Sequence, residues 1–231
     1  MQQSKESAIV FTGAGISAES GISTFRDSDG LWQKVKLEEV ATPQAWQSNP
    51  EKVLDFYNAR RSHLENVEPN AAHIAIAELE RYMDVTVVTQ NIDDLHERAG
   101  STHVVHLHGE LKKVRSTTNS DLIYERGFAP VKLGDLCEQG SQLRPHVVWF
   151  GEAVLNFELS RQLISRASHM LIVGTSLSVF PAADLVHDAS ASSIKVLVDK
   201  EIDMVPPGYH YIQGSATENV PLVIRDWTGR A

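Results

Sequence analysis

The chain contains a glycine-rich turn with the spacing of a phosphate-binding loop. Gly13, Gly15 and Ala18 satisfy the pattern G-x-G-x-x-A directly after an apolar run at residues 8–12. At such a turn, backbone N–H groups and a helix N-terminus can hold a pyrophosphate. An isolated match is equally typical of a tight turn that needs glycine at positive φ, so this pattern alone leaves both interpretations open.

Polar side chains follow a second apolar run. Gln90, Asn91 and Asp93 come directly after the β-branched segment at residues 85–89. Amides and a carboxylate in these positions can orient a reacting molecule through preorganised hydrogen bonds. Asn91 could instead cap a helix that starts at Ile92, and the spacing does not decide between the two roles.

Three histidines surround the next apolar run, at residues 104–107, and one of them is a candidate general base. They are His103, His106 and His108. A neutral imidazole, with an ordinary pKa of about 6.5, can accept a proton at neutral pH. Because side chains alternate along a strand, any of the three could lie in a site, in the core or on the surface.

The acidic residue of a conventional dinucleotide site is missing from its usual place. A hydride-carrier site needs this acid at the end of the second strand, roughly 20 residues beyond the glycines. Asp199, far downstream at the end of another apolar run, is the best candidate for a ribose-binding acid. A dinucleotide would therefore lie differently here than in an oxidoreductase.

The elements that must position these groups alternate between strands and helices. The apolar runs read as buried strands at residues 8–12, 85–89, 104–107, 170–173 and 195–198. Helices are expected over residues 50–66, capped by Ser48 or Asn49, and from Asn70 onward. This alternation predicts an α/β fold with a doubly wound parallel sheet, in which ligands bind outside the carboxyl ends of the strands. The polar groups should therefore converge.

Composition excludes several classes of partner. The 231 residues carry a net charge of −9, which argues against a nucleic-acid partner. There is no apolar stretch of about 18 residues and no signal-peptide pattern, so we expect no membrane partner and a cytoplasmic protein, taken as a monomer. The single cysteine, Cys137, excludes an internal disulfide framework.

Taken together, the motifs resemble the signatures of the sirtuin family, in its bacterial members. They stand in the expected order at residues 13–17 (GAGIS), 20–22 (SGI), 25–27 (FRD), 89–93 (TQNID), 107–110 (LHGE), 144–152 (RPHVVWFGE), 174–179 (GTSLSV), 181–182 (PA) and 214–216 (GSA). Several ordered motifs over nearly the whole chain are far more specific than one glycine loop.

The resemblance implies a Rossmann-like NAD-binding domain with a smaller inserted lobe. The domain would comprise residues 1–34, 71–110 and 144–231, and the lobe residues 35–70 and 111–143. The first lobe segment is helical in pattern, and the second resembles a degenerate zinc ribbon.

The resemblance also implies an NAD-dependent protein-lysine deacylase, with NAD as co-substrate and acylated-lysine proteins as substrates. The acyl oxygen captures the ribose carbon as nicotinamide leaves, and O-acyl-ADP-ribose is the second product. His108 would be the general base, Asn91 would lie near the ribose, and Asp93 would hold the nicotinamide carboxamide. Nicotinamide leaves as a neutral molecule, so its departure needs no general acid.

The same resemblance assigns the binding residues. Those for NAD would be Gly13, Ala14, Gly15, Ser17, Ala18, Glu19, Phe25, Arg26, Trp32, Gln90, Asn91, Ile92, Asp93, Gly174, Thr175, Ser176, Asp199 and Ala216. A substrate peptide would add as a strand along Val147, Val148, Phe150, Gly151 and Glu152.

Two residues on one helix indicate which acyl group is removed. Tyr57 and Arg60 stand three apart, so they share a helix face, and they match the Y-x-x-R pattern of desuccinylase-type (class III) sirtuins. A guanidinium can grip a carboxylate and a phenol can add a hydrogen bond. The small Ala18 leaves room for a longer acyl chain. We therefore expect removal of succinyl and malonyl groups, with some deacetylation retained.

The sequence departs from the family in the lobe. Most sirtuins hold a structural zinc there with two cysteine pairs, whereas this chain has only Cys137, and Ser116 stands at the first ligand position. We expect no zinc and assign no metal ligands, and whether the lobe binds a metal through atypical ligands stays open. The lobe should then rely on packing by Leu122, Ile123, Tyr124, Phe128, Leu133 and Leu136. Asp199 replaces an asparagine common in the family and should repel the extra phosphate of NADP.

Three other functions stay open at this point. A Rossmann oxidoreductase is disfavoured by the missing second-strand acid. A non-catalytic sensor of NAD or ADP-ribose is disfavoured by the presence of Asn91, Asp93 and His108. A protein mono-ADP-ribosyltransferase shares the first chemical step, and only its products would distinguish it.

Overall fold

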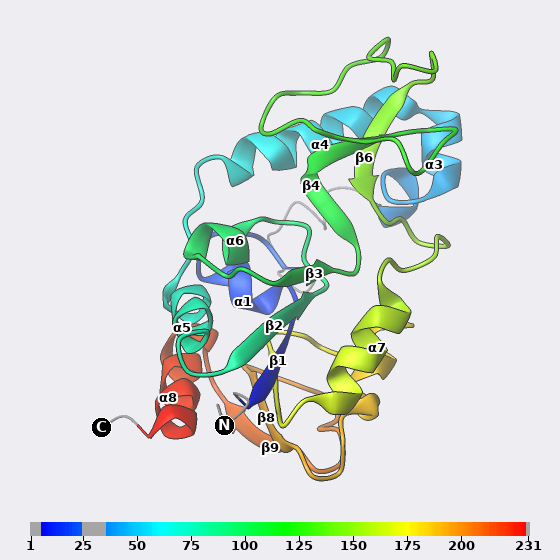
Figure 1. The fold of residues 1–231 in the computed structure, drawn as a ribbon. Coiled ribbons are helices and arrows are strands. Elements are labelled where there is room, and N and C mark those ends of the chain that lie inside the picture. The colour runs from blue at the N-terminus through cyan, green and yellow to red at the C-terminus, as the bar shows by residue number, and fades with distance from the viewer. Residues whose placement is uncertain (1–5, 25–35, 230–231) are drawn as a thin grey trace.

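The computed structural model describes residues 6–24 and 36–229, which form a central parallel sheet and a smaller antiparallel one (Figure 1). The central sheet has six strands in the order β3-β2-β1-β7-β8-β9, and every neighbouring pair is parallel. The strands are β1 (Ser7–Thr12), β2 (Asp84–Thr89), β3 (Val104–His106), β7 (His169–Val173), β8 (Ile194–Asp199) and β9 (His210–Gln213). The expected doubly wound α/β fold is confirmed.

Helices cover both faces of the central sheet, which is why its inner strands are continuous apolar runs rather than alternating ones. The helices α5 (Ala71–Leu79) and α8 (Ala216–Thr228) pack on one face, and α7 (Phe157–Arg166) and η2 (Ala182–Asp188) on the other (Figure 1). Two short helices, α1 (Gly15–Ala18) and α6 (Leu95–Ala99), follow the glycine turn and β2. No helix among the described residues has the length and apolar character needed to cross a membrane.

The smaller sheet has the strand order β5-β4-β6 and is antiparallel. It consists of β4 (Gly109–Ser116), β5 (Ile123–Glu125) and β6 (Leu143–Val147), and it packs beside η1 (Leu37–Glu39), α3 (Pro43–Ser48) and α4 (Pro50–Leu64) (Figure 1). Because β6 continues to Val147, the lobe boundary that we expected between residues 143 and 144 falls inside this strand.

Local capping explains where two of the helices begin. The Asn49 side chain accepts a hydrogen bond from the Lys52 N–H, and Pro50 occupies the first turn of α4. Asn70 and His73 form a capping box at the start of α5. The Asn70 side chain accepts from the backbone N–H of His73, and the His73 side chain accepts from the backbone N–H of Asn70. Of the two expected caps for α4, the structure therefore selects Asn49, and the helix ends at Leu64 rather than at residue 66.

The core of the lobe differs from our expectation. Ile123, Leu133 and Leu136 are exposed by 43%, 51% and 55%, while Leu122, Tyr124 and Phe128 are only partly buried. The buried residues are instead Leu54, Val114, Val131, Cys137 and Leu143. Successive side chains on a strand point to opposite faces, so the burial of Tyr124 on β5 turns Ile123 outward.

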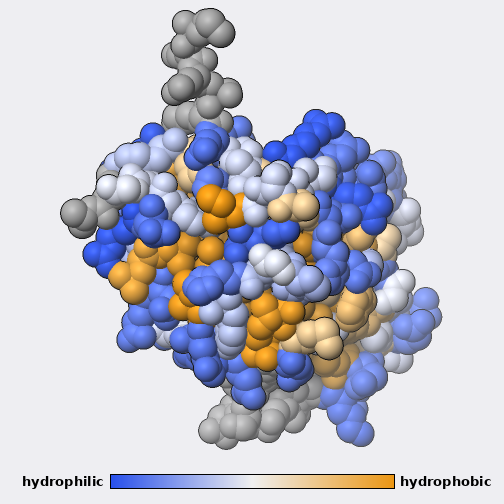
Figure 2. All heavy atoms as spheres, turned by 90° about the horizontal axis from the view of Figure 1, so that it is seen from below, coloured by the Kyte–Doolittle hydropathy of each residue, from blue (hydrophilic) through white to orange (hydrophobic). Residues whose placement is uncertain are grey.

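The surface opposite the lobe is mixed in character. Figure 2, seen from below the view of Figure 1, shows hydrophobic residues in several patches separated by hydrophilic ones. Isolated apolar side chains of this kind are normal on protein surfaces. The expected monomeric state stays a prediction.

Candidate active site

A cavity of about 540 Å³ lies between the two sheets, at the carboxyl ends of the parallel strands. Its walls combine the loops after β1, β2, β7 and β8 with residues of α4 and the segment after β6. This is the edge where a doubly wound sheet binds its ligands. Of the residues that we assigned to NAD, those on the walls are Gly13, Ala14, Gly15, Ala18, Gln90, Asn91, Ile92, Asp93, Gly174, Thr175, Ser176, Asp199 and Ala216.

Close approach of two loops fixes the glycines of the wall. The Gly13 N–H donates to the Val173 carbonyl at 3.1 Å, and the Gly15 N–H donates to the Gly174 carbonyl at 2.8 Å. A Cβ on Gly15 would lie 2.7 Å from the Gly174 Cα, and one on Gly174 would lie 2.2 Å from the Ile16 nitrogen. Neither Gly13 nor Gly15 has a positive φ, so close packing of the two loops, and not the positive φ of the alternative interpretation, is what requires glycine here.

Asn91 joins the β2 loop to the glycine turn. Its side-chain amide donates to the Gly13 carbonyl at 3.2 Å and to the Ser17 hydroxyl at 3.3 Å. The following helix, α6, starts at Leu95 with Asp94 in the capping position, so Asn91 is not a helix cap. The alternative role that its position after a strand suggested is wrong, and its side chain lies on the cavity wall instead.

Asp93 is a buried carboxylate held by a chain of directed hydrogen bonds. The Asn70 N–H donates to His73 Nδ1 at 3.3 Å, so Nε2 carries the proton that faces the Ser17 hydroxyl at 3.5 Å. The Ser17 hydroxyl in turn donates to Asp93 Oδ2 at 3.1 Å. Burial raises the pKa of Asp93 to about 6, so the group is mostly ionised at neutral pH and remains an acceptor.

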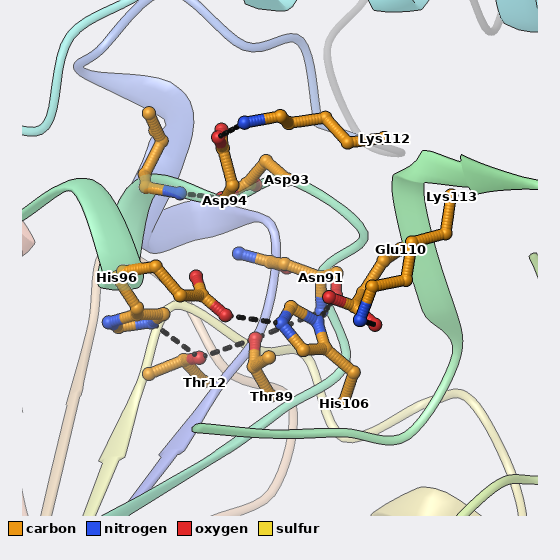
Figure 3. A network of polar contacts seen from close by, with 12 residues as sticks. Thr12, Thr89, Asn91, Asp93, Asp94, His96, His106, Glu110, Lys112 and Lys113 are labelled. Carbon is orange, nitrogen blue, oxygen red and sulfur yellow. Dashed lines mark hydrogen bonds and ion pairs between the residues drawn. The ribbon is translucent and has the colours of Figure 1, made fainter. Parts of the chain in front are cut away.

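A second group of buried polar side chains lies at the ends of β1 and β2, next to the loop that carries Asn91 and Asp93. The Thr12 hydroxyl donates to the Thr89 hydroxyl at 2.8 Å and contacts His96 Nε2 at 3.1 Å, as the row of dashed lines in Figure 3 shows. Burial lowers the pKa of His96 well below its ordinary value, so this imidazole is neutral. This group fixes the ends of β1 and β2 without bringing a charge beneath the site.

His108 is the only one of the three neighbouring histidines that lines the cavity. His103 is exposed, and His106 pairs with Glu97 away from this wall. His108 Nδ1 lies 2.9 Å from the Gln90 carbonyl, which can only accept, so Nδ1 is the donor and Nε2 keeps its lone pair. Burial lowers the pKa of His108, which keeps the ring neutral and able to accept a proton at neutral pH.

Two of the residues assigned to NAD stand outside the cavity wall. Ser17 is fully buried behind it and acts on Asp93, while the Glu19 carboxylate accepts from the Thr217 hydroxyl at 2.8 Å and faces Lys200 at 3.6 Å. Both residues therefore hold the loop in place. Gln90 does lie on the wall, and its side-chain amide donates to Thr175 at 2.9 Å. Phe25, Arg26 and Trp32 lie outside the described residues.

Tyr57 and Arg60 both reach the far end of the cavity from α4. Tyr57 is 2% exposed, and burial raises its pKa to about 12, so the phenol keeps its proton. The Arg60 guanidinium carbon lies 3.8 Å from the centre of the Phe56 ring. Burial lowers the pKa of Arg60 to about 10, which still leaves the side chain cationic at neutral pH. The alternative of a solvated face for Arg60 and Arg61 is wrong, since Arg61 is fully buried.

The segment assigned to peptide binding begins inside β6 and continues along the cavity. Val147 is buried, the Val148 N–H donates to the His108 carbonyl at 2.9 Å, and Phe150 is 48% exposed beside the open Gly151. Glu152 lines the cavity too. Its carboxylate accepts from Arg144 at 2.7 Å and from the Trp149 N–H at 2.8 Å, so it also shapes the segment.

Sequence reasoning missed several wall residues. Trp149 is buried and lines the cavity between Tyr57 and Arg144, and Ile22, Ala41, His63 and Leu64 line it as well. Trp149 belongs to the motif at residues 144–152, and this membership could have predicted that it lines the cavity. Ile22 likewise belongs to the motif at residues 20–22, whereas Ala41, His63 and Leu64 come from segments without a chemical pattern.

In the lobe, the positions where zinc ligands would be expected hold a hydrogen bond. The Cys137 thiol donates to the Ser116 hydroxyl at 3.4 Å. The sequence supplies only this one thiol, and a four-thiolate site cannot form from it. The absence of a structural zinc stays a prediction.

The sequence and the structure were compared with known proteins. The Sir2 family model matches residues 13–181. An NAD-dependent protein deacylase of Helicobacter pylori (strain ATCC 700392 / 26695) is 52% identical over 191 residues, covering 83% of each chain. An NAD-dependent protein deacylase of Bacteroides thetaiotaomicron is 49% identical over 219 residues, covering 92% of this chain and 94% of the relative.

Solved structures agree with this match. A mutant Sir2 homologue in complex with ADP ribose has a TM-score of 0.88 and 39% identity, covering 96% of this chain and 91% of that one. A Sir2 homologue in complex with NAD has a TM-score of 0.83 and 38% identity, covering 96% of this chain and 89% of that one.

Proposed function

The chain belongs to the Sir2 family, the sirtuins, and we propose that it removes succinyl and malonyl groups from protein lysine side chains, with some activity on acetyl groups. It is an NAD-dependent protein deacylase, as its relatives of about 50% identity are named. One observation carries the finer proposal: Tyr57 and Arg60 line the same cavity as His108 and Asn91. Acyl recognition and proton transfer therefore share one enclosed space.

The cavity walls fit NAD. Backbone at Gly13 and Gly15 lies close to backbone at Gly174, and Asp199, the last residue of β8, also lines the cavity. Glycine backbone suits a pyrophosphate, and a carboxylate suits two ribose hydroxyls. When bound, NAD supplies a ribose carbon that the acyl oxygen can attack as nicotinamide departs.

Asn91 and Asp93 orient the groups around that carbon. Their positions are set by Gly13 and Ser17, so the amide and the carboxylate need no rearrangement when the substrates arrive. Preorganised polar groups in a site that excludes water are worth more than the same groups in solution. Asp93 stays an acceptor at neutral pH and so suits a carboxamide N–H.

His108 moves the proton. Its Nδ1–H is committed to the Gln90 carbonyl, so Nε2 is the atom that accepts a proton from a ribose hydroxyl. The hydroxyl oxygen can then take over the acyl group. Because the ring is neutral before this step, no proton must first be lost to solvent.

Tyr57 and Arg60 recognise the far end of the acyl chain. A succinyl or malonyl group ends in a carboxylate, and the protonated guanidinium and the phenol are both donors. Burial strengthens their attraction for that carboxylate, since water screens it less. An acetyl group has no atom that can use these donors, so acetyl-lysine gains nothing from them.

Acylated proteins would dock along the segment from Val147 to Gly151. This segment follows the small sheet and borders the cavity, an arrangement in which an extended peptide can add as a further strand. Arg144 and Glu152 hold its backbone from behind. The acyl-lysine side chain would then enter the cavity beside His108.

Product analysis tests this function. When the enzyme acts on a succinyl-lysine peptide with NAD, we expect equal amounts of three products. These are the desuccinylated peptide, nicotinamide and O-succinyl-ADP-ribose, identified by mass spectrometry. An ADP-ribosylated peptide, with the succinyl group still attached, would show protein ADP-ribosylation instead. Nicotinamide release that does not depend on acylated peptide would likewise contradict the proposal.

A further inference from the structure

A second, smaller cavity of about 340 Å³ lies behind the catalytic loop. Its walls come from α6 and the residues after it, from β3, β4 and β6, and from the segment before α7, and they share no residue with the large cavity. The lining is polar, with Glu97, His106, Glu110 and Lys113 among its residues. Neither the proposed deacylation nor peptide binding uses any of these side chains.

Three potential metal ligands meet in this cavity. Glu97, His106 and Glu110 each offer one ligand atom, and these atoms lie within 4.8 Å of one another. They come from three different elements, α6, β3 and β4. Figure 3 shows His106 and Glu110 side by side beneath Asn91. Within the part of the chain that the structure describes, no other group of His, Cys, Asp and Glu side chains converges in this way.

The hydrogen bond behind His106 selects the nitrogen that faces the cluster. His106 Nδ1 lies 3.0 Å from the Asn91 carbonyl, so Nδ1 must donate. Nε2 faces the carboxylate oxygen Glu97 Oε1 at 2.8 Å and so donates to it in this structure, and a bound metal ion would take the place of that proton. A backbone carbonyl behind one ring nitrogen, with the other nitrogen left as the ligand, is the usual arrangement of histidines that bind metals.

The carboxylates can change partners without leaving a charge unpaired. Lys113 Nζ lies 2.6 Å from Glu110 and 3.6 Å from Glu125, so it keeps an acidic partner if Glu110 turns to a cation. The Glu97 side chain is 39% exposed, which opens the cluster to solvent and to ions.

Two further polar groups of the same cavity point independently to a ligand. The Ser101 hydroxyl and His146 Nδ1 are buried, in residues that are each 7% exposed, and neither has a hydrogen-bond partner among the described residues. Buried polar atoms are almost always paired with protein, water or an ion. Both can supply contacts to a bound ion or to its water ligands.

We propose that this cavity reversibly binds a divalent first-row transition-metal ion, with Glu97, His106 and Glu110 as its protein ligands. Two carboxylates and one imidazole suit such an ion, and water with Ser101 and His146 would complete its surroundings. This donor set differs from the four-thiolate zinc site that most sirtuins carry in the lobe, and the proposal does not depend on which acyl group is removed.

The ion would link the two parts of the fold at the catalytic histidine. His106 precedes His108 by two residues and Glu110 follows it by two. A metal bound to both, and to Glu97 of α6, would fasten β4 to the parallel sheet on either side of His108. Binding should therefore raise the melting temperature, because the ion binds the folded chain only.

Titration of chelator-treated protein with MnCl2, followed by electron paramagnetic resonance of free Mn²⁺, tests the site. We expect one saturable site per chain. Glu97→Gln and Glu110→Gln should each weaken binding by roughly tenfold or more, because even changes to groups that only orient a metal ligand cost about 10- to 100-fold. Glu65→Gln and His103→Asn alter an exposed carboxylate and an exposed histidine outside the ligand set and should bind as wild type.

A second measurement separates a missing site from a misfolded variant. Thermal melting without metal should show that Glu97→Gln and Glu110→Gln are folded, and added Mn²⁺ should raise the melting temperature of wild type but not of these two. The proposal is overturned if wild type shows no saturable site, or if folded ligand variants bind Mn²⁺ as tightly as wild type.

Discussion

The indole N–H of Trp149 donates a hydrogen bond to the Tyr57 hydroxyl over 3.1 Å, linking the segment after β6 to α4. An indole N–H can only donate, so the Tyr57 oxygen accepts and its own proton remains available to a second partner. Trp149 is itself held by Arg144, whose guanidinium carbon lies 3.2 Å from the indole centre. The Tyr57 hydroxyl is therefore positioned by the same segment that we propose binds the peptide.

Replacing Tyr57 with phenylalanine tests this donor. Tyr57→Phe removes the phenol hydroxyl, which is the proposed donor to the acyl carboxylate, and leaves the buried Trp149 N–H without its acceptor. We expect kcat/KM for succinyl-lysine peptide to fall roughly tenfold, about 1.4 kcal/mol, with little change for acetyl-lysine peptide. Unfolding in urea should show a loss of stability of about 1 kcal/mol. Tyr124→Phe, on β5 outside the cavity, is the control. An equal loss on both peptides would contradict a role in recognition.

His108→Ala should abolish deacylation and preserve NAD binding. Loss of a general base typically costs about 10²- to 10⁴-fold in rate, whereas the glycine turn and Asp199 do not depend on the imidazole. Formation of the deacylated peptide and isothermal titration with NAD measure the two effects separately. His103→Ala, an exposed neighbour, should leave both unchanged. Normal turnover by His108→Ala would remove the base assignment.

Stability should fall as the pH drops from about 6.5 toward 4, in part through His73. Burial lowers the pKa of His73 to about 4, so the unfolded chain binds a proton in this window while the folded chain does not. Protonation would also end its acceptance from Asn70. The contribution is on the order of 3 kcal/mol.

Urea unfolding of wild type and His73→Gln at several pH values measures this effect. The variant cannot titrate at this position, so its stability should depend less steeply on pH between about 6.5 and 4. Parallel curves for the two proteins would show that His73 is not the group responsible.

Gly174→Ala should weaken NAD binding through the backbone. Gly174 has φ of +62°, and its added Cβ would lie 2.2 Å from the Ile16 nitrogen, so the glycine turn must move. Gly127→Ala is a matched control, because Gly127 has the same φ of +62° with nothing within 4 Å. We expect roughly tenfold or greater loss of NAD affinity by titration calorimetry for the first variant only, about 1.4 kcal/mol. Equal affinities in both would contradict the role of this contact.

The sequence predicted those parts of the fold that depend on local pattern. Inner strands such as β1 and β7 are buried on both sides and appear as unbroken apolar runs. The edge strand β9 was missed, because its residues His210 to Gln213 are exposed or half-buried and lack both apolar continuity and clear alternation. Pairing with β8 creates this strand, and no local signal encodes it.

The same distinction holds for the site. Motif positions placed His108, Asn91 and Asp93 at the cavity, since each follows the end of a parallel strand. Spacing could not show that Ser17 and Glu19 face away from it or that Glu152 pairs with Arg144, because these contacts join segments far apart in sequence.

The most direct test is kcat/KM of wild type and Arg60→Met on matched succinyl-lysine and acetyl-lysine peptides with NAD. Arg161→Met, on α7 and outside the cavity, controls for the loss of a surface arginine. We predict that wild type prefers the succinyl peptide and that Arg60→Met loses at least tenfold, about 1.4 kcal/mol or more, on that peptide alone. A wild-type preference for acetyl-lysine, with Arg60→Met unchanged on both peptides, would contradict dicarboxylic acyl recognition.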